Sequence, residues 1–142
     1  MTGLCTLVVC GAPLAARAPE IATGLVVAGW RVQVVTTPSA ASWVDGAILA
    51  AAAGQSVRSE YRPVDAIKNR ERPAAVVVAP ITFNTVGKLA CGIADTYAHS
   101  TLCEALGDDL SILAVPMVNN RCGVTLLGLR TLTGSPALAC AG

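Results

Sequence analysis

Small or polar residues follow each of the four apolar runs that punctuate the first 120 residues. In chain order these residues are Gly11 and Ala12; Thr37 and Ser39; Thr82, Asn84 and Thr85; and Asn119 and Asn120. They supply hydroxyls, amides and backbone N–H groups, but no histidine and no group of carboxylates. Such a set is poorly suited to metal-assisted hydrolysis or to a Ser–His–Asp mechanism. It suits a polar, phosphate-bearing planar ligand held by neutral hydrogen bonds.

Helix capping is the alternative explanation for these residues. Ser, Thr and Asn directly before a helix are ordinary N-caps, and a cap needs a single oxygen. The second position offers Thr36 in addition to Thr37 and Ser39, and the third offers three polar side chains within four residues. Helix N-termini also favour anions through their free N–H groups and dipole. The surplus of polar groups therefore favours a small-molecule site over caps alone.

The glycine pattern restricts the class of nucleotide. The turn after the first run reads GAPLAA (11–16), which is neither GxGxxG nor GxxxxGK. Dinucleotide and P-loop sites are therefore disfavoured, and a mononucleotide such as FMN fits better.

Hydrophobic spacing predicts alternating strands and helices. Strands are predicted at 4–10, 31–37, 74–80 and 111–116, with 57–61 as a short strand or extended loop. Helices are predicted over 12–30, from 38, over 85–107 as one helix or two divided near Asp95, and from 119. This order predicts an α/β fold in which helices cover both faces of a parallel sheet. The carboxyl ends of parallel strands share one edge, where open α/β sheets hold their ligands.

The composition indicates one domain, residues 1–142, that assembles with copies of itself. The chain is 54% hydrophobic and only 13% charged, so we expect another subunit to cover part of its surface. Charged residues such as Arg17, Glu20 and Arg31 interrupt every candidate membrane span. No basic residue precedes the first apolar run, so we expect no signal peptide, no membrane partner and a cytoplasmic location. The net charge is +1, and the basic residues are scattered rather than gathered on one face. This argues against nucleic-acid binding.

The cysteines and the single histidine give weaker signals. The six cysteines form no CxxC pair and no metal-ligand spacing, so we expect reduced, mostly buried thiols and no metal. Cys10 precedes a predicted helix N-terminus, where a low pKa could make it a phosphocysteine carrier. The following GAPLAA lacks the hydroxyls that such a carrier needs, which leaves this a remote alternative. His99 is predicted to be structural or exposed, and a role for Cys122 stays open.

Several of these segments together resemble a known family. PITFNT (80–85) is similar to the PASANT signature of the homo-oligomeric flavin-containing cysteine decarboxylases, and the match continues through Lys88 and GIADT (92–96). VPMVNNRCG (115–123) resembles the second signature, P-x-M-N-x-x-M-W, with Pro116 and Asn119 in register. VTTPSA (35–40) and VCGAPLAA (9–16) resemble the two earlier turns of the same family.

The resemblance implies a flavodoxin-like (Rossmann-like) three-layer fold with FMN bound between subunits of a trimer or a multiple of trimers. It implies oxidative decarboxylation of a cysteine-derived or peptidyl-cysteine substrate. Gly11, Ser39, Thr82 and Thr85 would hold the FMN phosphate and ribityl chain, Asn84 would shape the site, and Asn119 would face flavin and substrate as a catalytic residue. Ala12, Thr37 and Phe83 complete the expected cofactor-binding set.

The sequence also departs from this family. Its decarboxylases use a histidine between the second and third strands as a base, and this chain has none from Trp43 to Ala98. Val118 and Cys122 stand where methionines are expected, and Gly123 replaces the tryptophan. The substrate flap is not visible, and the chain ends where such a sheet often adds a strand, as in a short or truncated member. Two functions stay open: an FMN-dependent enzyme, and a catalytically silent FMN-binding module.

Overall fold

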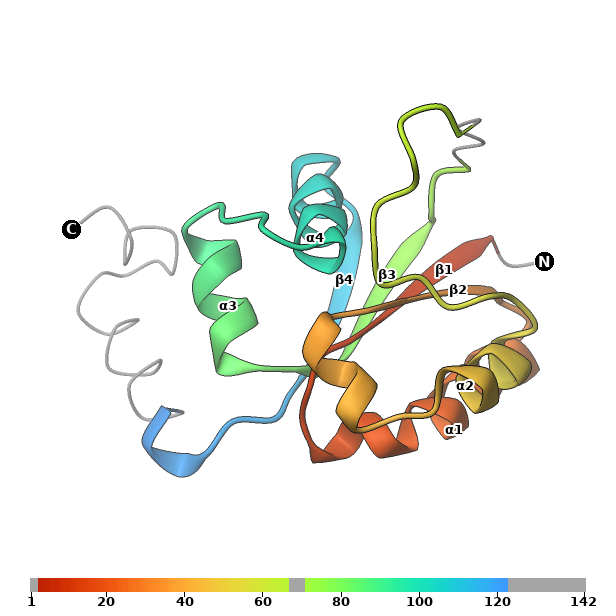
Figure 1. The fold of residues 1–142 in the computed structure, drawn as a ribbon, viewed down its shortest axis with the longest axis horizontal. Helices are drawn as coiled ribbons and strands as arrows, with labels where there is room; N and C mark the ends of the chain where they lie inside the picture. The colour runs from red at the N-terminus through yellow and green to blue at the C-terminus, as the bar shows by residue number, and fades with distance from the viewer. Residues whose placement is uncertain (1–2, 67–70, 123–142) are drawn as a thin grey trace.

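The centre of the molecule is a four-stranded parallel sheet. The computed structural model describes residues 3–66 and 71–122. The strands are β1 (Leu4–Val9), β2 (Arg31–Thr36), β3 (Ala75–Ile81) and β4 (Ser111–Pro116), in the order β2-β1-β3-β4 (Figure 1). β1 and β3 lie inside the sheet and are covered on both faces, so they read as unbroken apolar runs. The predicted parallel α/β fold is confirmed.

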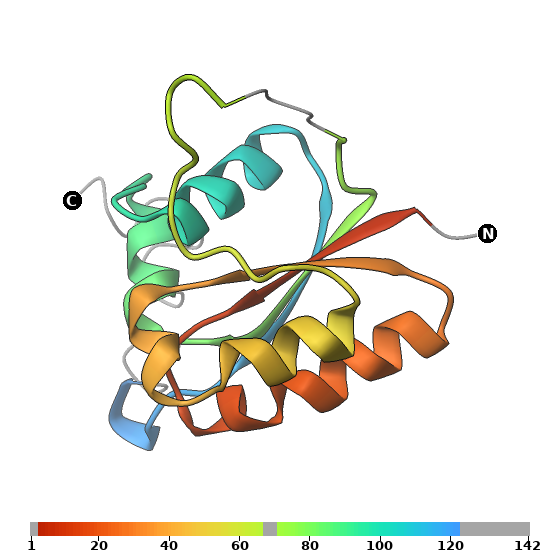
Figure 2. The same cartoon turned by 45° about the vertical axis from the view of Figure 1, so that its right-hand side comes forward.

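Helices cover both faces of the sheet and make three layers. α1 (Ala18–Val27) and α2 (Gly46–Ala53) lie on one face, and α3 (Phe83–Ala90) and α4 (Tyr97–Gly107) lie on the other (Figure 2). Short 3₁₀ helices, η1 (Pro13–Arg17) and η2 (Pro38–Ser42), follow β1 and β2. This is the flavodoxin-like arrangement that the family resemblance implies.

Prolines and caps explain where the predicted helix boundaries are wrong. The expected helix 12–30 is divided into η1 and α1, because each begins with a proline in its first turn. The helix expected from Pro38 is only the 3₁₀ turn η2, and α2 starts afresh where Asp45 caps its N-terminus. The expected division near Asp95 is confirmed: Gly92, with φ of +69°, follows α3, and Thr96 caps α4.

Alternate residues of β1, β2 and β3 build two cores. Leu7 and Val9 of β1 face α1 and α2, where small alanines (Ala15, Ala18, Ala22) let the chain pack closely on the sheet. Val8 and Cys10 face the opposite way and pack with Ala98, Leu102 and Ala105 of α4. This alternation places Cys10 beneath α3 and α4 rather than in the α1–α2 core.

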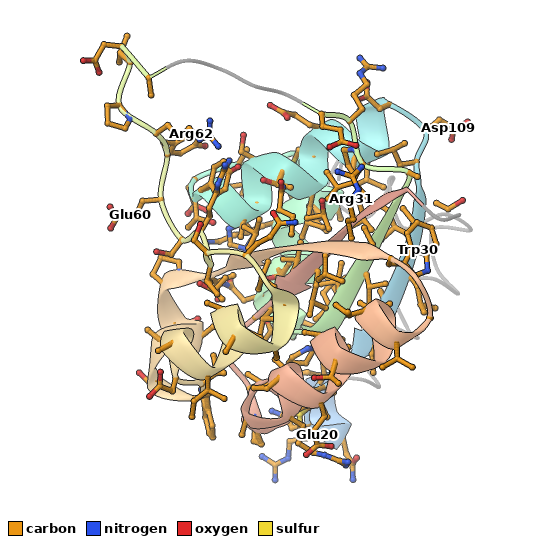
Figure 3. The ribbon with its side chains drawn as sticks, turned by 90° about the vertical axis from the view of Figure 1, so that its right-hand side faces the viewer. Glu20, Trp30, Arg31, Glu60, Arg62 and Asp109 are labelled. Atoms are coloured by element: carbon orange, nitrogen blue, oxygen red, sulfur yellow. The ribbon has the colours of Figure 1, made fainter. Side chains whose placement is uncertain are left out.

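The long connection from α2 to β3 forms one isolated parallel bridge with β2, at Arg58. The Arg58 N–H donates to the Val34 carbonyl at 3.0 Å, and the Thr36 N–H donates to the Arg58 carbonyl at 2.8 Å. Residues 57–61 are therefore an extended loop with a single parallel bridge to β2, between Val35 and Arg58. Charged side chains such as Glu60 on this connection and Glu20 on α1 point outward (Figure 3).

The structure also bears on the predictions for the last helix, the cysteines and membrane spans. Residues 120–122 are helical, and the rest of the helix expected from 119 lies outside the described residues. Cys5, Cys10, Cys103 and Cys122 are free thiols, whereas Cys91 is disulfide-bonded, so the expectation of reduced cysteines is wrong for Cys91. Over the described ranges, no helix has both the length and the apolar character needed to cross a membrane.

Candidate functional site

The loops after β1 and β2 meet at the carboxyl-terminal rim of the sheet, which we define as the residues directly following the four strands. A Cβ atom on Gly11 would lie 2.5 Å from Ser39 Oγ and 2.9 Å from the Ser39 carbonyl carbon. Only glycine allows so close an approach. Ser39 Oγ also lies 3.1 Å from Thr37 Oγ1, and the Thr37 N–H donates to the Val9 carbonyl at 3.0 Å. Three of the predicted cofactor residues are therefore held together.

The β3–α3 turn joins the same rim. The Cys10 N–H donates to the Pro80 carbonyl at 3.2 Å, which joins the ends of β1 and β3. Thr82 caps α3, because its Oγ1 accepts the Thr85 N–H at 3.3 Å. Asn84 is exposed in the first turn of this helix, and Phe83 is half-buried. The N-terminus of α3 thus presents hydroxyl, amide and free N–H groups at the rim, a combination that favours anions.

The segment after β4 lies on the other side of this turn. The Met117 N–H donates to the Ile81 carbonyl at 3.0 Å, and Met117 Sδ accepts the Leu14 N–H at 3.2 Å. Asn119 is exposed, and its Oδ1 accepts the Cys122 N–H at 2.9 Å. Asn119 therefore acts as a cap for residues 120–122, which leaves its amide N–H₂ as the group available to a ligand. Its predicted catalytic role stays a prediction.

Thr85 points inward, unlike the other predicted cofactor residues of this turn. Its side chain is 1% exposed, and its Oγ1 lies 3.4 Å from Cys10 Sγ and 3.0 Å from His99 Nε2. The Thr82 hydroxyl donates to the same oxygen at 3.2 Å. In this conformation the Thr85 hydroxyl forms hydrogen bonds with neighbouring side chains, so a direct contact to a cofactor stays a prediction.

His99 is the functional candidate that sequence reasoning missed. It is 3% exposed, and its Nδ1 lies 2.7 Å from Thr96 Oγ1 and 3.2 Å from Asp95 Oδ1. Asp95 is in turn bound by the Lys88 ammonium at 2.8 Å. The spacing from Asp95 to His99 was a usable signal, because residues four apart at a helix start lie close together. The contact to Thr85, fourteen residues away, required the fold.

Burial dominates the protonation of this cluster. Desolvation raises the pKa of the Cys10 thiol, and the hydrogen bonds to Thr85 and Thr82 only oppose it. Burial also lowers the pKa of His99, the Lys88 ammonium lowers it further, and the Asp95 carboxylate opposes both. The hydrogen bond from Lys88 lowers the pKa of Asp95. At neutral pH the cluster therefore holds a neutral thiol, a neutral imidazole and an ionised carboxylate.

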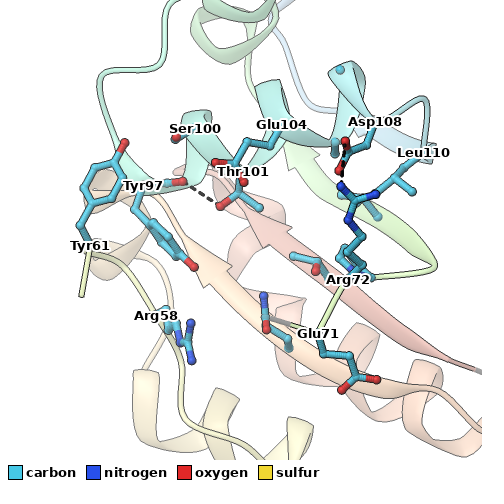
Figure 4. Close-up of a pocket in the computed structure, with 16 residues that line it drawn as sticks. Arg58, Tyr61, Glu71, Arg72, Tyr97, Ser100, Thr101, Glu104, Asp108 and Leu110 are labelled. Carbon is cyan, nitrogen blue, oxygen red and sulfur yellow. Dashed lines mark hydrogen bonds and ion pairs between the residues drawn. The ribbon is translucent and has the colours of Figure 1, made fainter. Parts of the chain in front are cut away.

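A separate pocket of about 740 Å³ lies away from the rim, on the α4 face of the sheet (Figure 4). Thr6, Gln33 and Val76 line it from the sheet, and Thr101 and Glu104 line it from α4. The Tyr61 ring packs edge-on against Tyr97 at one end, with 5.4 Å between ring centroids. These sheet residues belong to the amino-terminal halves of their strands, so this pocket is distinct from the rim.

Comparison with known proteins finds a matching family and similar solved structures. A family model described as Flavoprotein matches residues 4–125. No curated protein sequence matches the chain. Among solved structures, the FMN-dependent cysteine decarboxylase TvaF from thioviridamide biosynthesis is 27% identical, with a TM-score of 0.75 over 93% of this chain and 86% of that one. HAL3 from Cryptococcus neoformans is 25% identical, with a TM-score of 0.76 over 93% and 79%.

A more distant structure shares the fold alone. The peptidyl-cysteine decarboxylase EpiD is 20% identical, with a TM-score of 0.69 over 87% of this chain and 75% of that one. Together the family match and the FMN-dependent neighbour support the predicted cofactor, FMN.

Proposed function

Because the chain belongs to the flavoprotein family, we propose that it binds FMN at the carboxyl-terminal rim and acts as a flavin-dependent oxidoreductase or decarboxylase. Its substrate would be a small molecule or peptide that ends in a cysteine-derived group. The similarity to TvaF, an FMN-dependent cysteine decarboxylase, supports this substrate class.

The contact between Gly11 and Ser39 carries the proposal. The two turns pack so closely that a Cβ on Gly11 would collide with Ser39, and this approach places the exposed Ser39 hydroxyl beside the Gly11 backbone, where both can bind an anion. Thr37 and the N-terminus of α3 add neutral donors beside it. This donor set fits the phosphate and ribityl chain of FMN, which needs hydrogen bonds rather than metal ligands.

Each part of the rim has a distinct role in this proposal. Gly11, Ser39 and Thr82 hold the phosphate end, Asn84 orients the ligand from the first turn of α3, and Asn119 faces the substrate with its amide. When bound, FMN supplies two-electron redox chemistry, and the protein supplies binding and orientation. The half-buried Phe83 contributes apolar surface that limits water at the rim, whereas Ala12 is buried and supports the turn from beneath.

The test is reconstitution followed by turnover. Purified protein with added FMN should quench flavin fluorescence with 1:1 stoichiometry, and Ser39→Val should weaken that binding. Ser42→Ala, at the far end of η2, is the matched control and should bind as the wild type does. Protein that leaves flavin fluorescence unchanged would contradict the proposal.

The alternative function is an FMN-binding module without catalysis. The missing histidine between Trp43 and Ala98 favours it. Mass spectrometry of cysteine-ended peptides after incubation with the FMN-loaded protein separates the two functions. Loss of CO₂ and two hydrogens from the peptide supports the enzyme, and an unchanged peptide with FMN bound supports the module.

We also propose that the assembled form is a homo-oligomer of trimeric symmetry. Low charge and exposed apolar side chains such as Trp43 and Ile48 support self-association, because such side chains are commonly covered by a partner, and the trimeric symmetry follows from the family resemblance. The molar mass in solution tests it directly.

A further inference from the structure

The pocket on the α4 face of the sheet has a clear structural origin. α1 and α2 both lie on the opposite face, so β1 and β2 are covered on this face by α4 and by the extended connection that follows α2 (Figure 2). A cavity of about 740 Å³ remains between them, which we call the α4-face pocket. Pockets that hold small molecules commonly measure about 300–1,000 Å³.

Thr6 carries an unpartnered hydroxyl at the floor of the α4-face pocket. Its side chain is 0% exposed, and its Oγ1 has no hydrogen-bond partner among the described residues. Thr6 lies beside Gln33 of β2 and Val76 of β3 in the sheet, and all three residues line the pocket. A buried hydroxyl without a partner is less favourable than a methyl group of the same shape. Valine would therefore suit this position better unless the hydroxyl binds a molecule that enters the pocket.

Most charged residues in the lining already interact with other parts of the protein. Glu71 forms an ion pair with Arg31. Arg72 forms one with Asp108 at 3.7 Å. Glu104 is likewise engaged. The charges at this end of the pocket are therefore committed within the chain.

Arg58 differs from these residues. It lines the pocket and is half-buried, and its guanidinium has no ion-pair partner within residues 3–66 and 71–122. Its backbone is fixed to β2 by hydrogen bonds to Val34 and Thr36. A guanidinium in such a place offers paired N–H donors that match a carboxylate. Because it is the one uncommitted charge in the described lining, a ligand with a single negative charge fits best.

An aromatic surface lies beside Arg58. Tyr61 and Tyr97 pack edge to face, with 5.4 Å between ring centroids, and both line the pocket. Arg58 lies at the same end as this tyrosine pair, and Arg72 and Asp108 lie at the other end (Figure 4). Tyrosine rings favour contact with a further aromatic ring.

We propose that the α4-face pocket is a second ligand site, distinct from the rim, which binds a small aromatic carboxylate. Arg58 binds the carboxylate, and the ring of the ligand packs against Tyr97. Gln33 and Thr6 bind a polar group such as an amide, because a side-chain amide and a hydroxyl can each donate and accept. This pairing supplies the Thr6 hydroxyl with the partner that it lacks within the chain.

The first test is calorimetric titration with three related probes. N-acetyl-L-phenylalanine has the carboxylate, the amide and the ring, and we expect it to bind with 1:1 stoichiometry. N-acetyl-L-phenylalaninamide lacks the charge, and N-acetyl-L-alanine lacks the ring. We expect each of these to bind about 10-fold more weakly or worse. Absence of binding by N-acetyl-L-phenylalanine, or equal binding by all three probes, would overturn the proposal.

The second test uses Thr6→Val, which keeps the shape of the side chain and removes the hydroxyl. In the ligand-free protein this change should move the urea midpoint to higher concentration, because a buried hydroxyl without a partner is lost. The affinity for N-acetyl-L-phenylalanine should fall several-fold. A purely structural hydroxyl would give the reverse, a lower urea midpoint with unchanged affinity, and that result would overturn the role of Thr6.

The third test removes the charge with Arg58→Gln, which keeps the backbone hydrogen bonds to β2. The affinity for N-acetyl-L-phenylalanine should fall about 10-fold or more, whereas the affinity for the uncharged N-acetyl-L-phenylalaninamide should change little. Arg17→Gln is the matched control, because Arg17 is exposed and precedes α1 on the other face of the sheet. It should leave both affinities unchanged. An equal loss in Arg58→Gln and Arg17→Gln would contradict a direct contact to Arg58.

Two further measurements separate this site from the rim and from a subunit contact. Ser39→Val should leave the affinity for N-acetyl-L-phenylalanine unchanged, and added FMN should not displace this probe. Displacement by FMN would place the probe at the rim and overturn the second site. Light scattering should show the same molar mass with and without the probe. A probe that dissociates the assembly would show that a second copy of the chain fills the pocket, which would also overturn the proposal.

Discussion

Gly11 is the residue at which a single methyl group should have the largest effect on the rim. The backbone carbonyl carbon of Ser39 stands 2.9 Å from the position of an added Cβ, so rotation of the Ser39 side chain cannot relieve the clash. We expect Gly11→Ala to lower the free energy of unfolding by about 1–3 kcal/mol, as overpacking does. FMN affinity should fall at the same time, because the loop that carries Ser39 must move.

Urea unfolding and flavin fluorescence measure these two effects. Gly24→Ala is the control, because a Cβ on Gly24 in α1 would meet no atom within 4 Å. Removing a helical glycine there should raise the free energy of unfolding by about 0.5–1 kcal/mol. Equal behaviour of the two variants would contradict the close contact at Gly11.

His99 should make stability depend on pH. Its pKa is lower in the folded protein than in the unfolded chain, so the unfolded chain takes up the proton first as the pH falls. The stabilisation is complete above the unfolded value, about 6.5, and is lost as the pH falls from there through the folded value. The urea midpoint of the wild type should therefore fall more steeply across this window than that of His99→Gln. Parallel curves would show that His99 titrates alike in both states.

Sequence reasoning found the rim residues but not their inner partners. Gly11, Ser39 and Thr82 follow apolar runs, and the parallel topology brings such positions to one edge without further information. Cys10 and Thr85 are 75 residues apart, and Thr85 and His99 are 14 apart. Which of these side chains point inward depends on strand register and helix rotation, which no local pattern encodes.

At the scale of the helices and strands, caps decide where the helices begin. Asp45 accepts the N–H groups of Ala47 and Ile48 at 2.8 and 3.4 Å at the start of α2. We expect Asp45→Ala to lower the free energy of unfolding by about 1 kcal/mol, since two first-turn donors lose their acceptor. Chemical denaturation measures this, with Asp65→Ala, an exposed aspartate of the long connection, as a control that should stay near zero. A larger loss at Asp65 than at Asp45 would contradict the role of the cap.

The strands were predictable, whereas the helix starts were predictable only in part. Val and Leu runs bounded by Gly, Pro and Thr place all four strands to within about two residues. The helices around Pro13, Pro19 and Pro38 are rich in alanine, so their buried and exposed faces differ little in hydrophobicity. Their boundaries therefore follow from proline positions and from Asp45, rather than from the spacing of apolar residues.

At the scale of the whole molecule, the exposed apolar side chains predict self-association. Trp43 is 45% exposed and follows η2 at the rim, and Ile48 is 59% exposed on the neighbouring α2. We expect the wild type to have a molar mass several times its monomer mass of 14.4 kDa, and Trp43→Glu to shift it toward the monomer. Light scattering coupled to size exclusion measures this.

Val27 provides the control for this interface. It is 82% exposed but ends α1 at the amino-terminal edge of the sheet, away from the rim. Val27→Glu should keep the assembled mass. If Val27→Glu dissociates the protein and Trp43→Glu does not, the subunits meet at the other edge of the sheet.

The attachment of Arg58 to β2 also governs what else this strand can pair with. Its two backbone hydrogen bonds occupy Val34 and Thr36 on the outer side of the strand. Arg58→Pro would delete the bond to Val34, whereas Arg58→Ala would keep it, because only proline lacks the N–H. On warming, the proline variant should then form fibrils that bind thioflavin T, through pairing of its exposed strands. The alanine variant should show no thioflavin T signal. The link between α2 and β3 thus covers part of the edge of β2 and limits its pairing with a strand of another molecule.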